Sequence, residues 1–432
     1  MEINFIPSRY RKPLLALTTV IVFTVAYWLK PEYSQAKFIV DRPVFSQVPE
    51  APPYFESDFV SVTLDQYVHA ASITRLPSGE FMAVWFGGSR EGARDVNIYS
   101  ARFDPELKEW GANRVLVDRA YTEQSLSRMV RKLGNPVIGT APDGRVWVFY
   151  VSVSVGGWAG SAINYMVSDD DGRSWSKPKQ LRTTPFFNIS TLVRGQPVFH
   201  QDGTIGLPVY HEFMGKFPEY LRIDQQGQVI DKTRMHYGRD SLQPSMVVLS
   251  ETEAVSVLRY AGDGPRRVLV SQTQQTGEGW SMPRATPVPN PNSGLTAVRY
   301  NDDEILVVLN DLESNRYRLS LYLANRDLSQ WKLIKVLEES PDPMGRWIPR
   351  DQYKGLINKQ FLESDDDSHQ HLVQDFLARL DKRMCETEGC NFIYDYPYII
   401  RDDADNFHLI YTWNKSMIKH VEFNKNWLEQ YR

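Results

Sequence analysis

The chain has 432 residues, of which 42% are hydrophobic and 12% aromatic, so it can bury a sizeable core rich in β-strands. Its formal net charge of −4 gives no support to nucleic-acid binding, which needs clustered positive charge. The chain has two cysteines, which are too few for a structural zinc site, and no pattern in it calls for a metal or cofactor.

The first thirty residues predict a membrane anchor. Arg9, Arg11 and Lys12 precede an apolar run from Leu14 to Leu29. Basic residues before such a run place the N-terminus in the cytoplasm and the remainder outside. We therefore expect residues 1–30 to form a cytoplasmic stub and an inner-membrane helix.

A Pro-rich tether is expected over residues 31–57, which would place the rest of the chain in the periplasm or outside the cell. A cleaved signal peptide is the alternative, since Ser34-Gln35-Ala36 is an acceptable small-residue cleavage site. Tyr27 and Trp28 at the end of the apolar run favour the uncleaved anchor.

From about residue 58 onward, short β-rich runs alternate with Gly, Asp, Asn and Pro. Phe81–Phe86, Val96–Phe103 and Val146–Val153 are examples. Many short strands separated by turn signals indicate an all-β sandwich, barrel or propeller. A repeated element selects among these architectures.

The repeated element is a turn of the type Ser168-Asp-Asp-Asp-Gly-Arg-Ser-Trp175, and a second copy runs from Thr273 to Trp280. Short hydroxyl and carboxylate side chains close such a turn by bonding its backbone N–H groups, and Gly adopts positive φ. Weaker copies end at Trp110, Gly227, Trp331 and Trp427. Six copies predict a six-bladed β-propeller over residues 58–432, with its turn tryptophans on one face.

A helical insertion is expected at about residues 340–390. Gln370–Met384 has apolar residues at helical spacing, and Asp365–Asp367 before it resemble an acidic helix start. We expect Cys385 and Cys390 to form a disulfide that closes the insertion, with Cα atoms roughly 4.4–6.8 Å apart.

With these repeats, the sequence resembles the sialidase superfamily, in particular bacterial sialidase-like proteins with BNR (Asp-box) repeats. The segments that carry the resemblance include His69–Phe81, Trp85–Val96, Gly134-Asn-Pro136, Gln243-Pro-Ser245 and Tyr394-Asp-Tyr-Pro397. The resemblance implies an exo-glycosidase acting on an acidic sugar of envelope or extracellular glycans. Sialidases use a tyrosine nucleophile, and arginines suit the carboxylate of their substrate.

Carried over position by position, the resemblance implies that Tyr394 is the nucleophile and that Glu91 or Asp95 is the acid. His69, Arg90, Arg259, Arg316 and Gln243 are implied to bind substrate. Two positions depart from the family pattern, because His69 replaces the first arginine of the triad and Gln243 replaces the glutamate that activates the tyrosine.

These departures leave alternatives open. One is a lyase or hydrolase acting on a uronic acid, with His69 and Tyr394 as acid and base. Another is a propeller that binds glycans or assembles with partners without catalysis.

Overall fold

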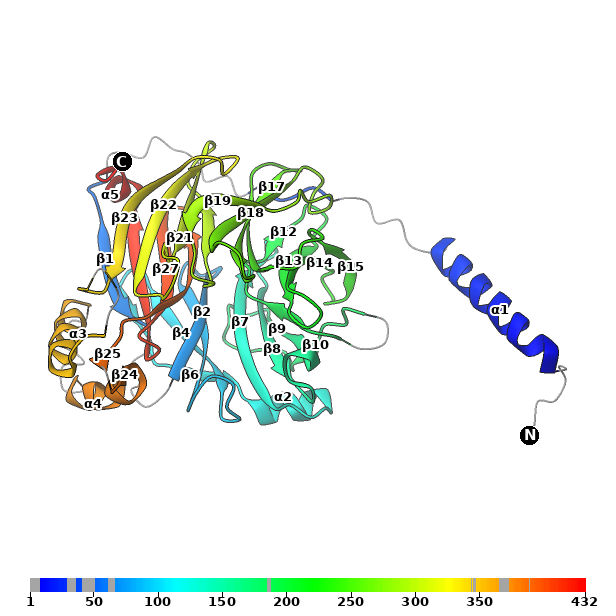
Figure 1. The fold of residues 1–432 in the computed structure, drawn as a ribbon, viewed down its shortest axis with the longest axis horizontal. Coiled ribbons are helices and arrows are strands. Elements are labelled where there is room, and N and C mark those ends of the chain that lie inside the picture. The colour runs from blue at the N-terminus through cyan, green and yellow to red at the C-terminus, as the bar shows by residue number, and fades with distance from the viewer. Residues whose placement is uncertain are drawn as a thin grey trace. The chain divides into compact units, whose positions relative to one another are not determined.

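The computed structural model describes residues 8–28, 36–40, 51–60, 67–184, 188–342, 344, 347–364, 373–387 and 389–432. The chain separates into two compact units, Met1–Ala36 and Lys37–Arg432. Figure 1 shows the fold.

The first unit contains α1 (Ser8–Trp28). Arg9, Arg11, Lys12 and Pro13 fall in its first two turns, and threonines interrupt the apolar residues that follow. Within the described ranges no helix combines the length and the mean hydropathy that crossing a membrane requires. The structure therefore does not support the expected membrane anchor.

The second unit is built from six antiparallel blades, which confirms the predicted propeller. Each blade pairs its strands in chain order from the inside outward, except that the last blade takes its outermost strand from the chain start. Blade 1 contains β2 (Tyr67–Arg75), β3 (Phe81–Gly88), β4 (Asn97–Asp104), β5 (Glu109–Trp110) and β6 (Arg114–Val117). Blade 2 contains β7 (Lys132–Thr140), β8 (Val146–Val153), β9 (Ser161–Ser168) and β10 (Lys179–Gln180), with α2 (Arg119–Leu126) before it.

Blade 3 contains β11 (Thr191–Val193), β12 (Val198–Phe199), β13 (Ile205–His211), β14 (Phe217–Ile223) and β15 (Val229–Arg234). Blade 4 contains β16 (Ser241–Val248), β17 (Ala254–Tyr260), β18 (Arg267–Thr273) and β19 (Arg284–Pro289). Blade 5 contains β20 (Thr296–Arg299), β21 (Glu304–Leu309), β22 (Arg318–Asn325) and β23 (Trp331–Glu339). Blade 6 contains β26 (Tyr394–Arg401), β27 (Asn406–Trp413), β28 (Met417–Asn424) and β1 (Phe55–Phe59).

The blades form a closed ring. Inner strands of neighbouring blades contact each other, and β26 of the last blade contacts β2 of the first. β1 completes blade 6 by pairing antiparallel with β28, so that Phe55 lies opposite Phe423. This pairing covers the outer edge of β28, which would otherwise expose unpaired backbone groups.

Part of the expected tether therefore belongs to the propeller. β1 includes residues 55–57, and Phe38 is fully buried and forms a β-bridge with His200. The propeller unit begins at Lys37 rather than at residue 58.

The repeated turns share one position, and three of them share one geometry. They connect the third and fourth strands of a blade, as between β9 and β10 or between β18 and β19. The indole N–H of Trp175 donates to Gly172, that of Trp280 to Gly277 and that of Trp331 to Leu328, each three residues back. Because the turns occupy the same step of each blade, they lie at the end of the blades where the inner strands finish.

The carboxylate of the clearest turn has a structural role. Asp170 accepts hydrogen bonds from the side chain and backbone of Ser174 and from the Ser168 hydroxyl, and these bonds lower the pKa of Asp170 to about 2. A carboxylate whose acceptor sites are used in this way stabilises the turn and needs no other partner.

The insertion lies between β23 and β26 and contains two helices rather than one. These are α3 (Arg350–Ser364) and α4 (Val373–Met384), and α3 packs beside β1 (Figure 1). The predicted disulfide joins Cys385 and Cys390 across a two-stranded sheet of β24 (Cys385–Glu386) and β25 (Gly389–Cys390). Their Cα atoms are 3.9 Å apart, less than the expected range of roughly 4.4–6.8 Å.

Asn424 links the last helix to the closing strand β1. α5 (Lys425–Glu429) follows β28, and the side chain of Asn424 caps it by accepting from the N–H of Trp427. The same side chain accepts from the N–H of Tyr54, just before β1. The sixth repeat copy is therefore a capped helix that holds the closing strand in place.

Candidate functional site

The candidate site begins with an irregularity that four inner strands share. The pairing register shifts after His69 in β2, after Gly134 in β7, after Leu242 in β16 and after Asp395 in β26. Such β-bulges change the direction of a side chain and are frequent beside active sites.

At each bulge one residue has positive φ, and none of the four is glycine. They are Ala70, Asn135, Gln243 and Tyr396, with φ between 44° and 54°. The last three immediately precede a proline, which normally favours extended backbone in the residue before it. A residue held in this region costs about 1–3 kcal/mol, and such strain concentrates at functional sites.

The side chains of Gln243 and Tyr396, each at one of these bulges, are hydrogen-bonded to each other. The Nε2 group of Gln243 donates to the Tyr396 hydroxyl at 3.3 Å, and Arg259 Nη1 donates to the same hydroxyl at 3.1 Å. Arg259 Nη1 also donates to Gln243 Oε1 at 3.0 Å. Because the Tyr396 oxygen accepts two N–H groups, its own proton is free to be given to a bound molecule.

Arg316 reaches the same place from the loop before β22. Its Nη2 donates to the carbonyl oxygen of Asn292 at 3.0 Å, while Arg259 Nε donates to the side chain of Asn292 at 2.7 Å. The two guanidinium groups therefore lie on either side of one residue. Arg316 also forms an ion pair of 2.8 Å with Asp395, the neighbour of Tyr396.

Asp395 is a buried carboxylate, and nearby positive charges keep it ionised. Burial raises its pKa, but the charge and hydrogen bond of Arg316, together with the charge of Lys415, outweigh burial, and the net pKa is lower than usual. Its Oδ2 atom is buried and has no hydrogen-bond partner within the described ranges.

His69 is a buried histidine in contact with Tyr396. It is 4% exposed, and its ring meets the Tyr396 ring edge-on at a centroid distance of 4.5 Å. Burial lowers the pKa of His69 to about 4, although Asp395 and Glu91 act in the opposite direction. The imidazole is therefore neutral at physiological pH.

The acidic loop after β3 contributes Glu91 rather than Asp95. Asp95 accepts both the backbone N–H and the hydroxyl of Ser89 at 2.9 Å, so it stabilises its own loop. Glu91 accepts a long hydrogen bond of 3.4 Å from the Tyr67 hydroxyl, and its charge acts on His69. Arg90 is exposed, and no contact places it in the cluster.

Glu212 is a further carboxyl group near the cluster, and it was not predicted from the sequence. Glu212 follows β13, and burial raises its pKa while Arg259 and Lys216 lower it less strongly. A carboxyl group with a raised pKa near a charge cluster is a candidate general acid.

Tyr394 does not join the cluster. It is fully buried in a hydrophobic core with Phe392 and Tyr353, and burial raises its pKa well above the usual value. Tyr394 and Tyr396 are two residues apart, but the bulge between Asp395 and Tyr398 separates their surroundings. Tyr396 therefore occupies the position that the sequence assigned to Tyr394.

A signal for Tyr396 was present in the sequence. Asn135, Gln243 and Tyr396 each precede a proline near the start of an inner strand, so the three positions correspond. Aligning the Tyr396-Pro397 pair with the Gln243-Pro244 pair selects Tyr396. The segment Pro289–Gly294 also carries the resemblance and contains Asn292, whereas no comparable signal marks Glu212, whose place depends on loop conformation. Across the described ranges no group of three or more His, Cys, Asp or Glu side chains is arranged to hold a metal ion.

The six-bladed ring, the Asp-box turns and the arginine–tyrosine cluster define a sialidase-like propeller. The chain belongs to the family described as the BNR repeat-like domain, whose model matches residues 79–409. No curated protein matches the chain.

Solved structures share the fold at low sequence identity. The Hadza microbial sialidase Hz136 has a TM-score of 0.59 and 14% identity, over 83% of this chain and 66% of its own length. A protein of unknown function from Dyadobacter fermentans has a TM-score of 0.60 and 12% identity, over 85% of this chain and 98% of its own. A leech intramolecular trans-sialidase complexed with 2,7-anhydro-Neu5Ac has a TM-score of 0.57 and 10% identity, over 85% of this chain and 69% of its own.

Proposed function

We propose that this propeller is a glycoside-active enzyme that binds an acidic sugar by its carboxylate. The observation that carries the proposal is the meeting of Arg259 and Arg316 at Asn292, beside the Tyr396 hydroxyl. Planar guanidinium groups match the geometry of a carboxylate, and two of them from different blades would fix its orientation. The sugar bound by the leech trans-sialidase also carries a carboxylate, which supports this class of ligand.

In the proposed site, Tyr396 contacts the reacting part of the sugar. Glu212, whose pKa is raised, or Glu91 on the rim would protonate the glycosidic oxygen. Attack by Tyr396 requires a base to accept its proton, and the amide of Gln243 cannot act as one.

This lack of a base favours a second candidate, elimination on a uronic acid. Neutral His69 would remove the proton next to the sugar carboxylate while Tyr396 gives its proton to the leaving glycosidic oxygen. A C–H bond and a C–O bond break, and a carbon–carbon double bond forms. The two N–H groups that Tyr396 accepts leave its proton free for this transfer.

The test is a panel of sialic acid glycosides and uronic acid oligosaccharides incubated with the purified protein. Release of free sialic acid supports the first candidate, and ultraviolet absorbance of an unsaturated uronate supports the second. Binding without turnover would support a glycan-binding module, and no binding of any acidic sugar would refute the proposal.

Variants of the two arginines test whether they bind the carboxylate. Each guanidinium makes charge-assisted hydrogen bonds, so Arg259→Gln or Arg316→Gln should weaken binding about 10- to 100-fold. Arg145→Gln is the matched control, because Arg145 pairs with Asp143 in the turn between β7 and β8, at the other end of the blades, and should not change binding.

We also propose that the propeller works outside the cytoplasm. Its disulfide between Cys385 and Cys390 is typical of an oxidising compartment. Reporter fusions to the propeller should be active only outside the cytoplasm, and activity confined to the cytoplasm would contradict this.

A further inference from the structure

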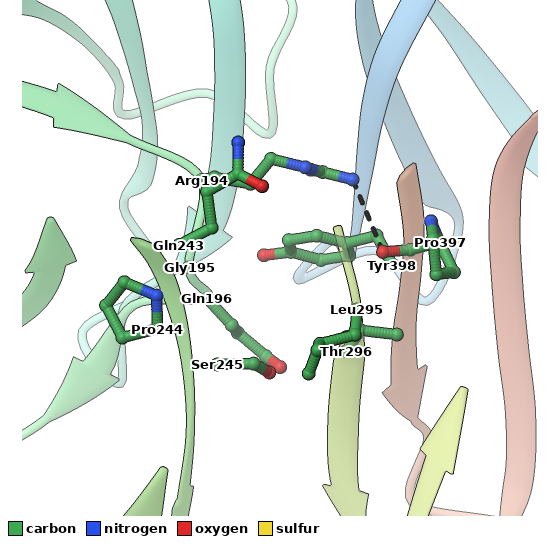
Figure 2. A pocket seen from close by; sticks show the side chains of 10 residues that line it. All are labelled: Arg194, Gly195, Gln196, Gln243, Pro244, Ser245, Leu295, Thr296, Pro397 and Tyr398. Carbon is green, nitrogen blue, oxygen red and sulfur yellow. Dashed lines mark hydrogen bonds between the residues drawn. The ribbon is translucent and has the colours of Figure 1, made fainter. Parts of the chain in front are cut away.

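A buried arginine crosses the propeller axis beneath the candidate site. Arg194, in the link between β11 and β12 of blade 3, is 5% exposed. Its Nη2 donates to the carbonyl oxygens of Tyr396 at 2.8 Å and of Pro397 at 3.3 Å, both in blade 6 on the opposite side of the ring. Figure 2 shows the side chain extending toward Pro397 and Tyr398, and its guanidinium lies over the rings of Tyr396 and Tyr398.

Among the described residues, no acidic side chain pairs with Arg194. Neither a carboxylate nor any other acceptor within the described ranges bonds its Nη1 atom, which is buried. Burial lowers its pKa to about 10, so the group remains a cation at neutral pH. A buried cation without a partner is costly, since desolvation of an ion costs several kcal/mol.

Arg194 lines a small axial cavity of about 10 Å³. Tyr398, Ser245 and Thr296 line it as well (Figure 2). The Tyr398 hydroxyl is buried without a partner among the described side chains and backbone. The Ser245 oxygen accepts the N–H of Ala297 and the Thr296 oxygen accepts that of Ile399, so in each hydroxyl the proton remains available.

The lining is therefore rich in donors. One guanidinium N–H group and three hydroxyl protons have no acceptor in the part of the chain that the structure describes. A cavity of this volume holds one small species. A water molecule would itself bring two further protons, for which the lining offers the amide oxygen of Gln196, whereas an anion accepts from every donor and neutralises the guanidinium.

We propose that the axial cavity binds a small monovalent anion, with chloride as the representative, held by Arg194, Tyr398, Ser245 and Thr296. The anion neutralises the cation that fixes the backbone of Tyr396, and thereby stabilises the bulge on which the candidate site is built. The proposal concerns a cavity below the candidate site and holds whether or not that site acts on a glycoside.

Thermal unfolding tests the proposal through ligand linkage. Sodium chloride is varied against sodium gluconate at constant ionic strength, with the full chain. An anion that binds only the folded state should raise Tm by about 2 °C for each tenfold increase in chloride, given the size of this domain. A Tm that does not depend on chloride would overturn the proposal.

Variants separate this site from general salt effects. Arg194→Met should abolish the chloride dependence, and Arg145→Met, which removes a guanidinium near the surface of blade 2, should keep it. If Arg194→Met does not fold, Tyr398→Phe and Ser245→Ala each remove one donor and should reduce the slope. Equal slopes in all variants would show that chloride acts elsewhere.

Crystals grown from protein prepared in sodium bromide give a direct readout. An anomalous peak in the cavity, within hydrogen-bonding distance of Arg194 Nη1, is expected. Density without an anomalous signal, interpretable as water, would refute the anion site.

Discussion

Replacing Arg316 by glutamine should destabilise the fold through Asp395. The Asp395 carboxylate is 1% exposed and has its Oδ1 atom 2.8 Å from Arg316 Nη1, so the variant leaves a buried charge without its main counter-charge. Breaking a buried pair by removing one partner costs about 3–5 kcal/mol. The Arg316 side chain is 27% exposed and water can partly replace it, so we expect the lower end, about 3 kcal/mol.

The loss should depend on pH in a defined direction. In the native protein the pKa of Asp395 is lowered, so its contribution is present above its unfolded pKa and is lost as pH falls through its folded pKa. Without Arg316, burial dominates and the folded pKa of Asp395 should rise above the unfolded value. The destabilisation should then be complete at neutral pH and should shrink as pH falls through that raised pKa.

Urea unfolding of both proteins at pH 7.5 and pH 5 measures the difference in unfolding free energy at each pH. The double variant Arg316→Gln/Asp395→Asn, which removes the stranded charge, should recover most of the loss. A deficit below about 1 kcal/mol, or one that the second substitution does not reduce, would refute the assignment of the cost to Asp395.

Three further predictions concern other parts of the chain. Tyr396→Phe should abolish turnover of an acidic glycoside, whereas Tyr394→Phe should leave kcat and KM unchanged; the reverse result in a steady-state assay would restore Tyr394 as the reacting tyrosine. Gly195→Ala should cost about 1–3 kcal/mol in urea unfolding, because its Cβ would lie 2.3 Å from the carbonyl oxygen of Pro244. Thiol titration of the unfolded, unreduced protein should find Cys385 and Cys390 unreactive, and two free thiols would contradict the disulfide.

Much of the architecture could be predicted because it depends on local chemistry. The turns ending at Trp175 and Trp280 close through their own side chains and backbone, so their sequence identifies them without knowledge of the fold. Counting such turns predicts the blades. The start of the propeller could not be counted in this way, since β1 and Phe38 carry no repeat signal and their positions depend on partners far along the chain.

The candidate site likewise contains residues that could be predicted from sequence and one choice that could not. Arg259, Arg316 and Gln243 could be named from sequence because the resemblance to sialidases marks these positions, and hydrogen bonds now join them in one cluster with Asn292. The choice between Tyr394 and Tyr396 could not be made from residue type, because a single bulge in β26 decides which side chain faces the cluster.

The sequence by itself thus determined the number of blades and the turns, since these follow from short-range hydrogen bonding and periodic spacing, and the arginines were expected only from the resemblance to sialidases. Only the tertiary structure decided which tyrosine reaches the axis, that His69 is neutral, and that Arg194 lies buried beneath the site without an acidic partner. Each of these depends on burial, and burial is set by all six blades packing together rather than by any one segment.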